Sequence, residues 1–443
     1  MRALREKLRR RDDGGFTIAE VMVALMIFAL MSTGSIYATI SMLQITRDAR
    51  NRQVAANLAA QEIDAVRATK DVMTVVDNSA TSVQNGTTFY MSRTSSWVPA
   101  SGGGTSPCGA SDGNANLRYK EITVSVTWDG MRSQASPVTS NTLLNPRDPV
   151  VDETKSTILV TVLGADGTGR QGVTVTASGA SSASATTDNQ GCAYLLKVTP
   201  GNYNVKVSKS NYVDQDQQAT SAASAYVEAG ATASVQFQYD QKATFALSYA
   251  PDYVLAPPAS KVRTIAALPV TFSNSYASTV MTPTSASTIM TQSFALHPFA
   301  SGYSVYAGTC TSANPEAWGA DPPAPVGTAG GTTASVPVAM GVVLVTLPSG
   351  GAKELVAVPT TSAVPGDPGC SNLASGTSFS FGTGSSFTLS GGTTTAVALP
   401  YGSWQLKWGG AVVSASQMTP VGIPAQTTIS PGNNVITFDP RLP

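Results

Sequence analysis

The sequence has few charges, a single histidine and four cysteines, and each scarcity argues against a class of function. Charged residues make up 12% of the chain, against about 25% in typical soluble domains. Basic and acidic residues number 27 each, so net charge indicates no basic face for nucleic acid. A Ser-His-Asp triad would have to use His297, which precedes a proline in an aromatic stretch and is expected to pack in a core.

Motifs of cofactor and metal sites are missing as well. The glycine runs neither follow a strand nor open a helix, which a phosphate-binding loop requires. The cysteines are too widely spaced for a zinc ligand set; they are Cys108, Cys192, Cys310 and Cys370. We therefore expect no cofactor, no metal site and no enzymatic activity.

The cysteines instead suggest disulfides, which persist in an oxidising compartment. Four cysteines allow three possible connectivities. We expect Cys310 to bond Cys370, since both lie in the C-terminal half. Cys108 and Cys192 would then bond each other or remain free thiols.

A basic leader followed by a long apolar run is the most informative feature that is present. Residues 1–15 hold six basic and three acidic residues, and no charged residue occurs from Val21 to Thr46. That run exceeds the roughly 20 residues needed to span a bilayer, and the basic excess favours a cytoplasmic N-terminus. Glu20 is a lone carboxylate near the start of the apolar segment, and such a group is a candidate functional residue.

The pattern Gly15-Phe16-Thr17-Ile18-x-Glu20 at the edge of an apolar run resembles the type IV prepilin leader. That family includes the pseudopilins of type II secretion and the competence pilins. The resemblance implies that a prepilin peptidase cleaves between Gly15 and Phe16 and methylates the new amine. It also implies that Glu20 pairs with the amine of Phe16 in a neighbouring subunit, which sets the filament register.

Helical character continues beyond the apolar segment. Residues 53–67 are alanine-rich and amphipathic, with Val54, Leu58, Glu62 and Ala65 spaced near 3.6 residues and Ile63 and Val66 beside them. The low charge and the many glycines and prolines of the remaining chain favour turn-rich β structure. We predict an α+β fold: a long N-terminal transmembrane pilin helix and a small β-sheet head, followed by all-β Ig-like or prealbumin-like sandwich modules.

Strand and turn signals suggest how the outer region divides. Strands predicted at 158–163, 172–177 and 200–207, with a turn into another at 186–194, resemble the carboxypeptidase-regulatory-like and collagen-adhesin B-type sandwich. Similar signals return at 342–347 and 399–408, which suggests a duplicated module with an insertion around Cys370. The predicted parts are a leader (1–15), a helix (16–68), a pilin-like head (69–148), the sandwich (153–241), a β-rich module (243–340) and a second sandwich (341–443).

These features predict a structural subunit: a large minor pilin, adhesive or close to the tip, of a type IV pilus-like filament. It would begin as a single-pass inner-membrane protein and then lie in an extracellular filament or at the cell surface. Its partners would be other pilins, the peptidase, an inner-membrane assembly platform and a surface or glycan ligand. Two alternatives are a pseudopilin of a type II secretion-like system and a membrane-anchored adhesin that does not polymerise.

Overall fold

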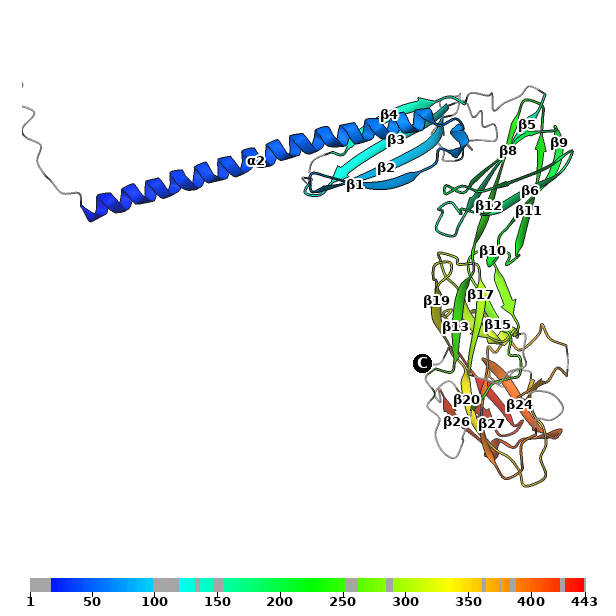
Figure 1. The fold of residues 1–443 in the computed structure, drawn as a ribbon. Helices are drawn as coiled ribbons and strands as arrows, with labels where there is room; N and C mark the ends of the chain where they lie inside the picture. The colour runs from blue at the N-terminus through cyan, green and yellow to red at the C-terminus, as the bar shows by residue number, and fades with distance from the viewer. Residues whose placement is uncertain are drawn as a thin grey trace, which may run out of the picture. The chain divides into compact units, whose positions relative to one another are not determined.

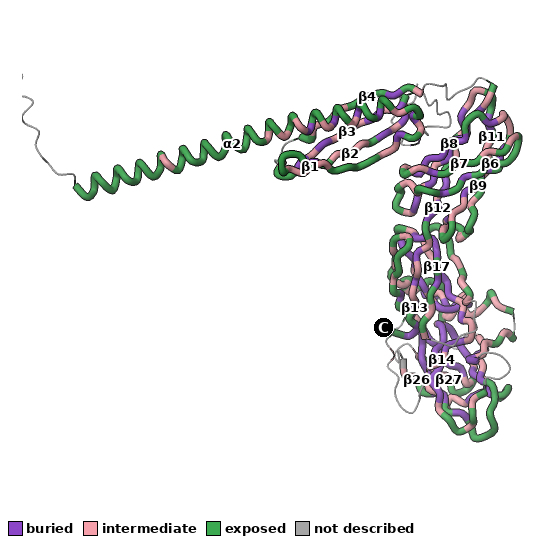
Figure 2. Tube along the Cα trace, in the orientation of Figure 1, coloured by how far each residue is buried: buried purple, intermediate pink, exposed green. Residues whose placement is uncertain are grey.

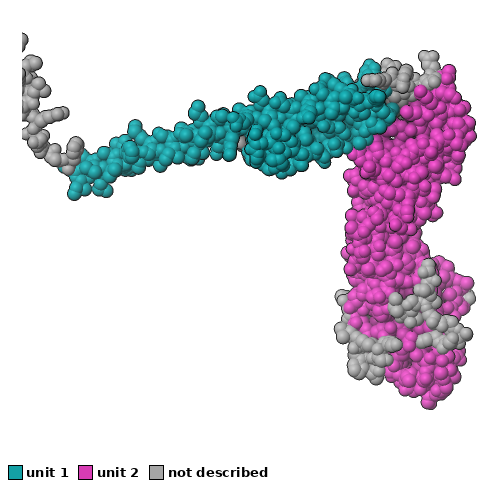
Figure 3. All heavy atoms as spheres, viewed as in Figure 1, with its two compact units in different colours: residues 1–150 teal, residues 151–443 magenta. Residues whose placement is uncertain are grey.

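The computed structural model is shown in Figure 1, and element labels below follow that figure. It describes residues 17–98, 108, 119–131, 136–146, 154–251, 253, 262–283, 290–360, 364–374, 376–382, 388–422 and 427–441. The chain forms two compact units, residues 1–150 and residues 151–443 (Figure 3).

The first unit is built on one helix, α2, which runs from Ile18 to Ala68 without a break. Thr17 caps its start, and its end at Thr69 turns into extended backbone. A short 3₁₀ turn, η1 (Val72–Thr74), leads into the head. The helix continues through Gly34, since one glycine in a helix interior costs only about 1 kcal/mol relative to alanine.

The head is an antiparallel sheet in the order β1-β2-β3-β4. Its strands are β1 (Asn78–Gln84), β2 (Thr87–Val98), β3 (Tyr119–Trp128) and β4 (Val138–Leu144). Asn85 and Gly86 join β1 to β2 with positive φ at both positions, the backbone that a two-residue hairpin turn needs. Alternate β3 residues from Ile122 to Trp128 are buried, and the C-terminal half of α2 contacts β3 and β4 (Figure 2).

The second unit starts with a sandwich of two four-stranded sheets, β10-β12-β5-β8 and β11-β9-β6-β7. The strands are β5 (Ser156–Leu163), β6 (Thr174–Gly179), β7 (Ser182–Thr186), β8 (Cys192–Val198), β9 (Gly201–Ser208), β10 (Tyr212–Asp214), β11 (Thr220–Val227) and β12 (Thr232–Gln241). Valines on facing strands, such as Val160, Val175 and Val205, fill its core together with Phe237 and Tyr239.

The rest of the second unit holds four further sheets around one continuous core, which extends from Ala243 to Phe438. The sheets are β17-β13-β19, β16-β15-β18, β14-β23-β20-β26, and β22-β21-β24-β28-β27 with β25 beside β24. Their strands are β13 (Ala243–Tyr249), β14 (Val262–Arg263), β15 (Val270–Ser273), β16 (Ser278–Met281), β17 (Thr291–Leu296), β18 (Ser304–Ala307), β19 (Thr333–Val338), β20 (Gly341–Thr346), β21 (Leu355–Pro359), β22 (Phe379–Ser380), β23 (Thr394–Leu399), β24 (Gly402–Trp408), β25 (Ala411–Val412), β26 (Met418–Gly422), β27 (Thr427–Ser430) and β28 (Val435–Phe438). Short 3₁₀ helices lie at η2 (Thr311–Ala313), η3 (Pro315–Trp318) and η5 (Ala415–Gln417).

The predicted fold class is confirmed: one long apolar helix is followed by sheets that are mostly antiparallel. The domain boundaries stay predictions. One observation bears on the boundary drawn at residue 340: β14, from the predicted β-rich module, pairs in parallel with β23 of the predicted second sandwich.

Candidate functional site

The first turn of α2 holds the Glu20 carboxylate within its own chain. Thr17 N donates to Glu20 Oε2 at 3.1 Å, and Thr17 Oγ1 donates to the same oxygen at 3.0 Å. In return, Glu20 N donates to Thr17 Oγ1 at 3.3 Å. This reciprocal arrangement is a capping box, which satisfies amide donors that a helix start leaves unpaired. Gly15 and Phe16 lie outside the described residues.

The N-terminal half of α2 exposes apolar side chains on every face. Phe28 is 69% exposed and Tyr37 is 81% exposed, and the helix is long and apolar enough to cross a membrane, with a mean hydropathy of 1.9 over its apolar window. Hydroxyl groups within it bond their own helix; Thr39 Oγ1, for example, donates to Ser35 O at 2.9 Å. A helix that is apolar all round requires lipid or other helices around it.

The C-terminal half of α2 packs on the head through a stripe of two alanines followed by an isoleucine and a valine. Ala55, Ala59, Ile63 and Val66 are buried, one position away from the stripe of Val54, Leu58, Glu62 and Ala65 that spacing predicted. At Ala55 and Ala59 the small side chain lets the helix backbone approach the sheet closely, so Val54 and Leu58 lie beside the contact line and are only half-buried. Glu62 lies at the edge of this contact line and pairs with Arg93 Nη1 at 2.7 Å.

The structure joins Cys310 to Cys370, the pair that the sequence predicted, across 60 residues of sequence. Cys108 and Cys192 are also disulfide-bonded, so no described cysteine is a free thiol. The bond between Cys108 and Cys192 themselves stays a prediction.

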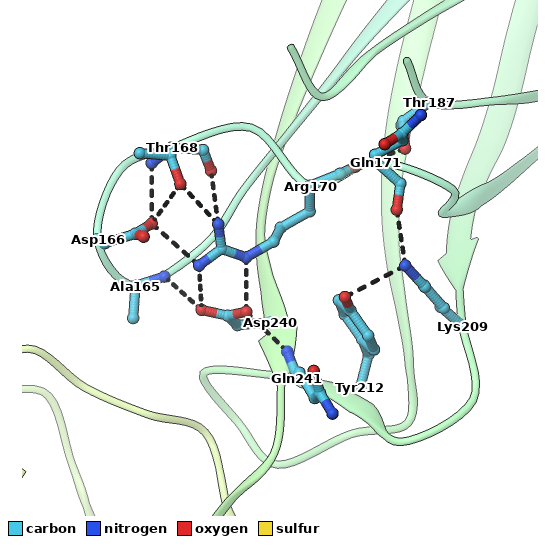
Figure 4. A network of polar contacts seen from close by, with 10 residues as sticks. All are labelled: Ala165, Asp166, Thr168, Arg170, Gln171, Thr187, Lys209, Tyr212, Asp240 and Gln241. Atoms are coloured by element: carbon cyan, nitrogen blue, oxygen red, sulfur yellow. Dashed lines mark hydrogen bonds and ion pairs between the residues drawn. The ribbon is translucent and has the colours of Figure 1, made fainter. Parts of the chain in front are cut away.

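An ion-pair network ties the end of the first sandwich to the loop after its first strand (Figure 4). Arg170 Nε donates to Asp240 Oδ1 at 2.6 Å, Arg170 Nη2 donates to Oδ2 at 2.8 Å, and Ala165 N donates to Oδ2 at 3.0 Å. Burial alone would raise the pKa of Asp240, but these hydrogen bonds and the Arg170 charge outweigh it and hold the pKa below its usual value. The network holds the loop after β5 against the end of β12.

His297 lies where the first sandwich meets the region that follows it. The side chain is 1% exposed, and neither ring nitrogen has a hydrogen-bond partner among the described residues. Its backbone N donates to Gln217 Oε1 at 2.7 Å, and its backbone O accepts from Tyr303 Oη at 2.9 Å. Burial lowers the pKa of His297, as expected for an imidazole packed in a core. Within the described ranges, no group of three or more His, Cys, Asp or Glu residues is placed to hold a metal ion.

An open pocket of about 390 Å³ lies between β15, β18 and η3. Its lining includes Asn274, Ser275, Ser301, Tyr306, Asn314, Glu316, Pro322 and Pro325. Sequence reasoning missed this pocket, because its residues come from loops that only the fold brings together. No spacing pattern along the chain marks it.

Comparison with known proteins identifies the N-terminal segment. A family model described as the prokaryotic N-terminal methylation motif matches residues 10–36. The chain therefore carries the methylation motif of type IV prepilins, as the sequence predicted. The matched segment includes the first turns of α2, whose apolar side chains are exposed. Among curated proteins, none matches the chain.

Among solved structures, three similarities are weak. The TIE protein of Bacillus anthracis is 14% identical with a TM-score of 0.21, covering 76% of this chain and 68% of that one. The minor pilin GBS52 of Streptococcus agalactiae is 15% identical with a TM-score of 0.17, covering 31% of this chain and 63% of that one. A streptococcal ancillary pilin is 14% identical with a TM-score of 0.19, covering 49% and 75%. Scores this low establish no shared fold or function.

Proposed function

We propose that this chain is a large minor pilin of a type IV pilus-like filament. A prepilin peptidase cleaves between Gly15 and Phe16, and the helix then enters the filament with its apolar half against neighbouring helices. The observation that carries the proposal is the methylation motif at residues 10–36, located at the start of a helix whose apolar half is exposed on every face.

Glu20 is the assembly residue in this proposal. Its carboxylate would pair with the amine of Phe16 in the adjacent subunit, because each charge alone is costly in apolar surroundings and the pair offsets much of that cost. The pairing fixes how far each subunit advances along the filament. The β modules beyond the helix are displayed outward, where an adhesive or tip-proximal role suits their size.

Processing is tested by an immunoblot of cells that produce Gly15→Ala with a C-terminal epitope. The expected result is a full-length precursor and no chain in sheared filaments. Gly14→Ala is the matched control, since it changes the adjacent glycine and leaves the cleaved bond unaltered. A Gly15→Ala chain of mature size at normal filament abundance would refute the proposed processing.

Assembly is tested separately with Glu20→Gln, which keeps the size of the side chain and removes its charge. Processing should be normal while the amount in sheared filaments falls strongly. Normal filament incorporation of Glu20→Gln would instead support the anchored adhesin that never polymerises. Loss of protein secretion without loss of surface fibres in a deletion strain would favour the pseudopilin alternative.

A further inference from the structure

The first sandwich meets the region that follows it at a joint with a single covalent link. One residue, Lys242, separates β12 from β13. Its backbone N donates to Asn211 O at 2.9 Å, in the first sandwich, and its backbone O accepts from Gly331 N at 3.0 Å, in the following region. The link is therefore held from both sides, and bending of the chain at Lys242 would break these hydrogen bonds.

One turn of the first sandwich also docks onto the following region. Gln217 lies in the turn between β10 and β11, with a φ of 64°. Its Nε2 donates to Tyr303 Oη at 3.2 Å, and its Oε1 accepts from His297 N at 2.7 Å. In the same turn, Asp216 Oδ1 accepts from Tyr276 Oη at 3.1 Å. Side chains of a single turn thus carry several of the polar contacts across the joint.

The His297 imidazole is enclosed at this joint without a hydrogen bond. The side chain is 1% exposed, and neither ring nitrogen has a hydrogen-bond partner among the described residues. The centre of its ring lies 4.8 Å from that of Phe299, which lies 5.5 Å from that of Tyr303. A neutral imidazole fits this aromatic setting. A protonated one would bring a buried charge with no acceptor for either N–H group, which is costly.

The charged groups that act on the imidazole all belong to the first sandwich. Among the described residues they are the carboxylates of Asp240 and Asp214 and the guanidinium of Arg170. Asp240 is engaged by Arg170 through two hydrogen bonds (Figure 4), and Asp214 Oδ1 accepts from two amides of its own turn, at 3.0 and 2.8 Å. Because both carboxylates already have partners, burial outweighs their attraction and lowers the pKa of His297.

We propose that this joint is an acid-sensitive hinge: the first sandwich and the following region stay docked while His297 is neutral, and protonation of its imidazole releases the turn that carries Gln217. In the open joint, water can solvate the imidazolium that the closed joint excludes. The β region beyond Lys242 would then be held in place at neutral pH and swing more freely in mild acid. The hinge does not depend on filament assembly, because all of its residues lie in the second unit.

Proton linkage gives the direction and the size of the effect. In the open joint His297 has its ordinary pKa of 6.5, and in the closed joint its pKa is lower. Docking is therefore most stable above pH 6.5 and weakens as the pH falls towards the pKa of the closed joint. A change from pH 7.5 to pH 5.5 covers one unit below 6.5, so the opening equilibrium constant should rise by up to about tenfold.

The test is hydrogen exchange on the purified full chain in detergent at pH 7.5 and pH 5.5, corrected for the intrinsic effect of pH on exchange. The amides of Lys242 and His297 are the reporters, since both donate to acceptors of the first sandwich. They should exchange faster than the core amides of β9, and their opening should increase at pH 5.5 by up to about tenfold. Reporters as protected as β9 at both pH values, or no increase at pH 5.5, would overturn the proposal.

His297→Phe tests whether the imidazole is the sensor. It keeps the backbone contacts and an aromatic ring but cannot take up a proton, so opening at the Lys242 amide should change by less than about twofold between the two pH values. A response as large as that of wild type would show that other groups cause the acid sensitivity, which would overturn the role of His297.

Gln217→Ala tests the docking turn independently of pH. Losing the side chain that joins Tyr303 and His297 should raise opening at the Lys242 amide by about fivefold or more at pH 7.5. Gln218→Ala is the matched control, because this neighbouring side chain donates to Asp216 O within its own turn, and it should leave the opening unchanged. Equal opening in the two variants would show that the turn does not hold the joint closed.

Discussion

The first sandwich and the C-terminal sheets share a pattern of strand pairing and differ at two places. Four antiparallel pairings correspond: β5–β8 with β20–β23, β6–β9 with β21–β24, β6–β7 with β21–β22, and β9–β11 with β24–β28. This correspondence agrees with the duplication that the sequence suggested. However, β12 lies parallel to β5, whereas β26 lies antiparallel to β20.

The second difference is an insertion. Residues 180 and 181 join β6 to β7, whereas residues 360–378 join β21 to β22 and contain Cys370. The first copy is stabilised by the Arg170–Asp240 ion pair within it. In the second copy, Cys370 of the insertion is bonded to Cys310, which lies between β18 and η2 of the preceding region, and Arg441 pairs with Asp439 at 2.7 Å. One arrangement of strands can therefore be stabilised by different contacts at its edges.

Removing the disulfide should have the largest effect, confined to the C-terminal region. Cys310→Ser with Cys370→Ser opens a link across 60 residues, which in a chain-entropy account lowers the free energy of unfolding by about 4 kcal/mol. Hydrogen exchange should accelerate in β24 peptides and remain unchanged in β9 peptides. Equal acceleration in both would mean that the two regions unfold together, which would break the comparison.

Arg170→Ala should have the next largest effect and act on the first sandwich. It leaves Asp240, whose side chain is 3% exposed, as a buried charge without its partner, at a cost of about 3 kcal/mol. Hydrogen exchange in β5 and β12 would report it. Arg170→Lys should recover part of the loss, because lysine keeps the charge and lacks the two-pronged geometry.

Arg441→Ala is the counterpart in the C-terminal region. The Arg441 side chain is 31% exposed, so solvent can replace much of its contact with Asp439. Arg441→Ala should therefore lower the free energy of unfolding by less than Arg170→Ala does. A larger loss of stability for Arg441→Ala than for Arg170→Ala would show that the Arg441–Asp439 pair stabilises the protein more than the Arg170–Asp240 pair does.

The smallest predicted effect concerns pH at His297. Its pKa in the fold lies below the ordinary 6.5, so the unfolded chain binds the proton more readily. Stability should be fully present above pH 6.5 and fall as pH decreases towards the folded pKa. Thermal unfolding at pH 7.5 and pH 5.5 should show this loss in wild type and a reduced loss in His297→Phe. If His297→Phe loses as much stability as wild type between pH 7.5 and pH 5.5, other titratable groups must cause the pH dependence.

Many of the strands were predictable, because they follow from local patterns of apolar and turn-forming residues. The strand predicted at 158–163 lies within β5, and the strand predicted at 342–347 is shifted by one residue from β20. The pairing of β5 with β12 and the Arg170–Asp240 contact were not predictable, since they join residues about 70 positions apart. The capping box was within reach, because Thr17-x-x-Glu20 is a recognisable helix-start pattern.

The capping box has a consequence for how subunits would join. In the single chain, the amide and the hydroxyl of Thr17 both donate to one oxygen of the Glu20 carboxylate. Docking in the proposed filament would then be a partner exchange, in which an incoming amine replaces a hydroxyl and an amide. Replacing one set of hydrogen bonds to the carboxylate by another costs less free energy than removing water from a free charge, and the replacement is reversible.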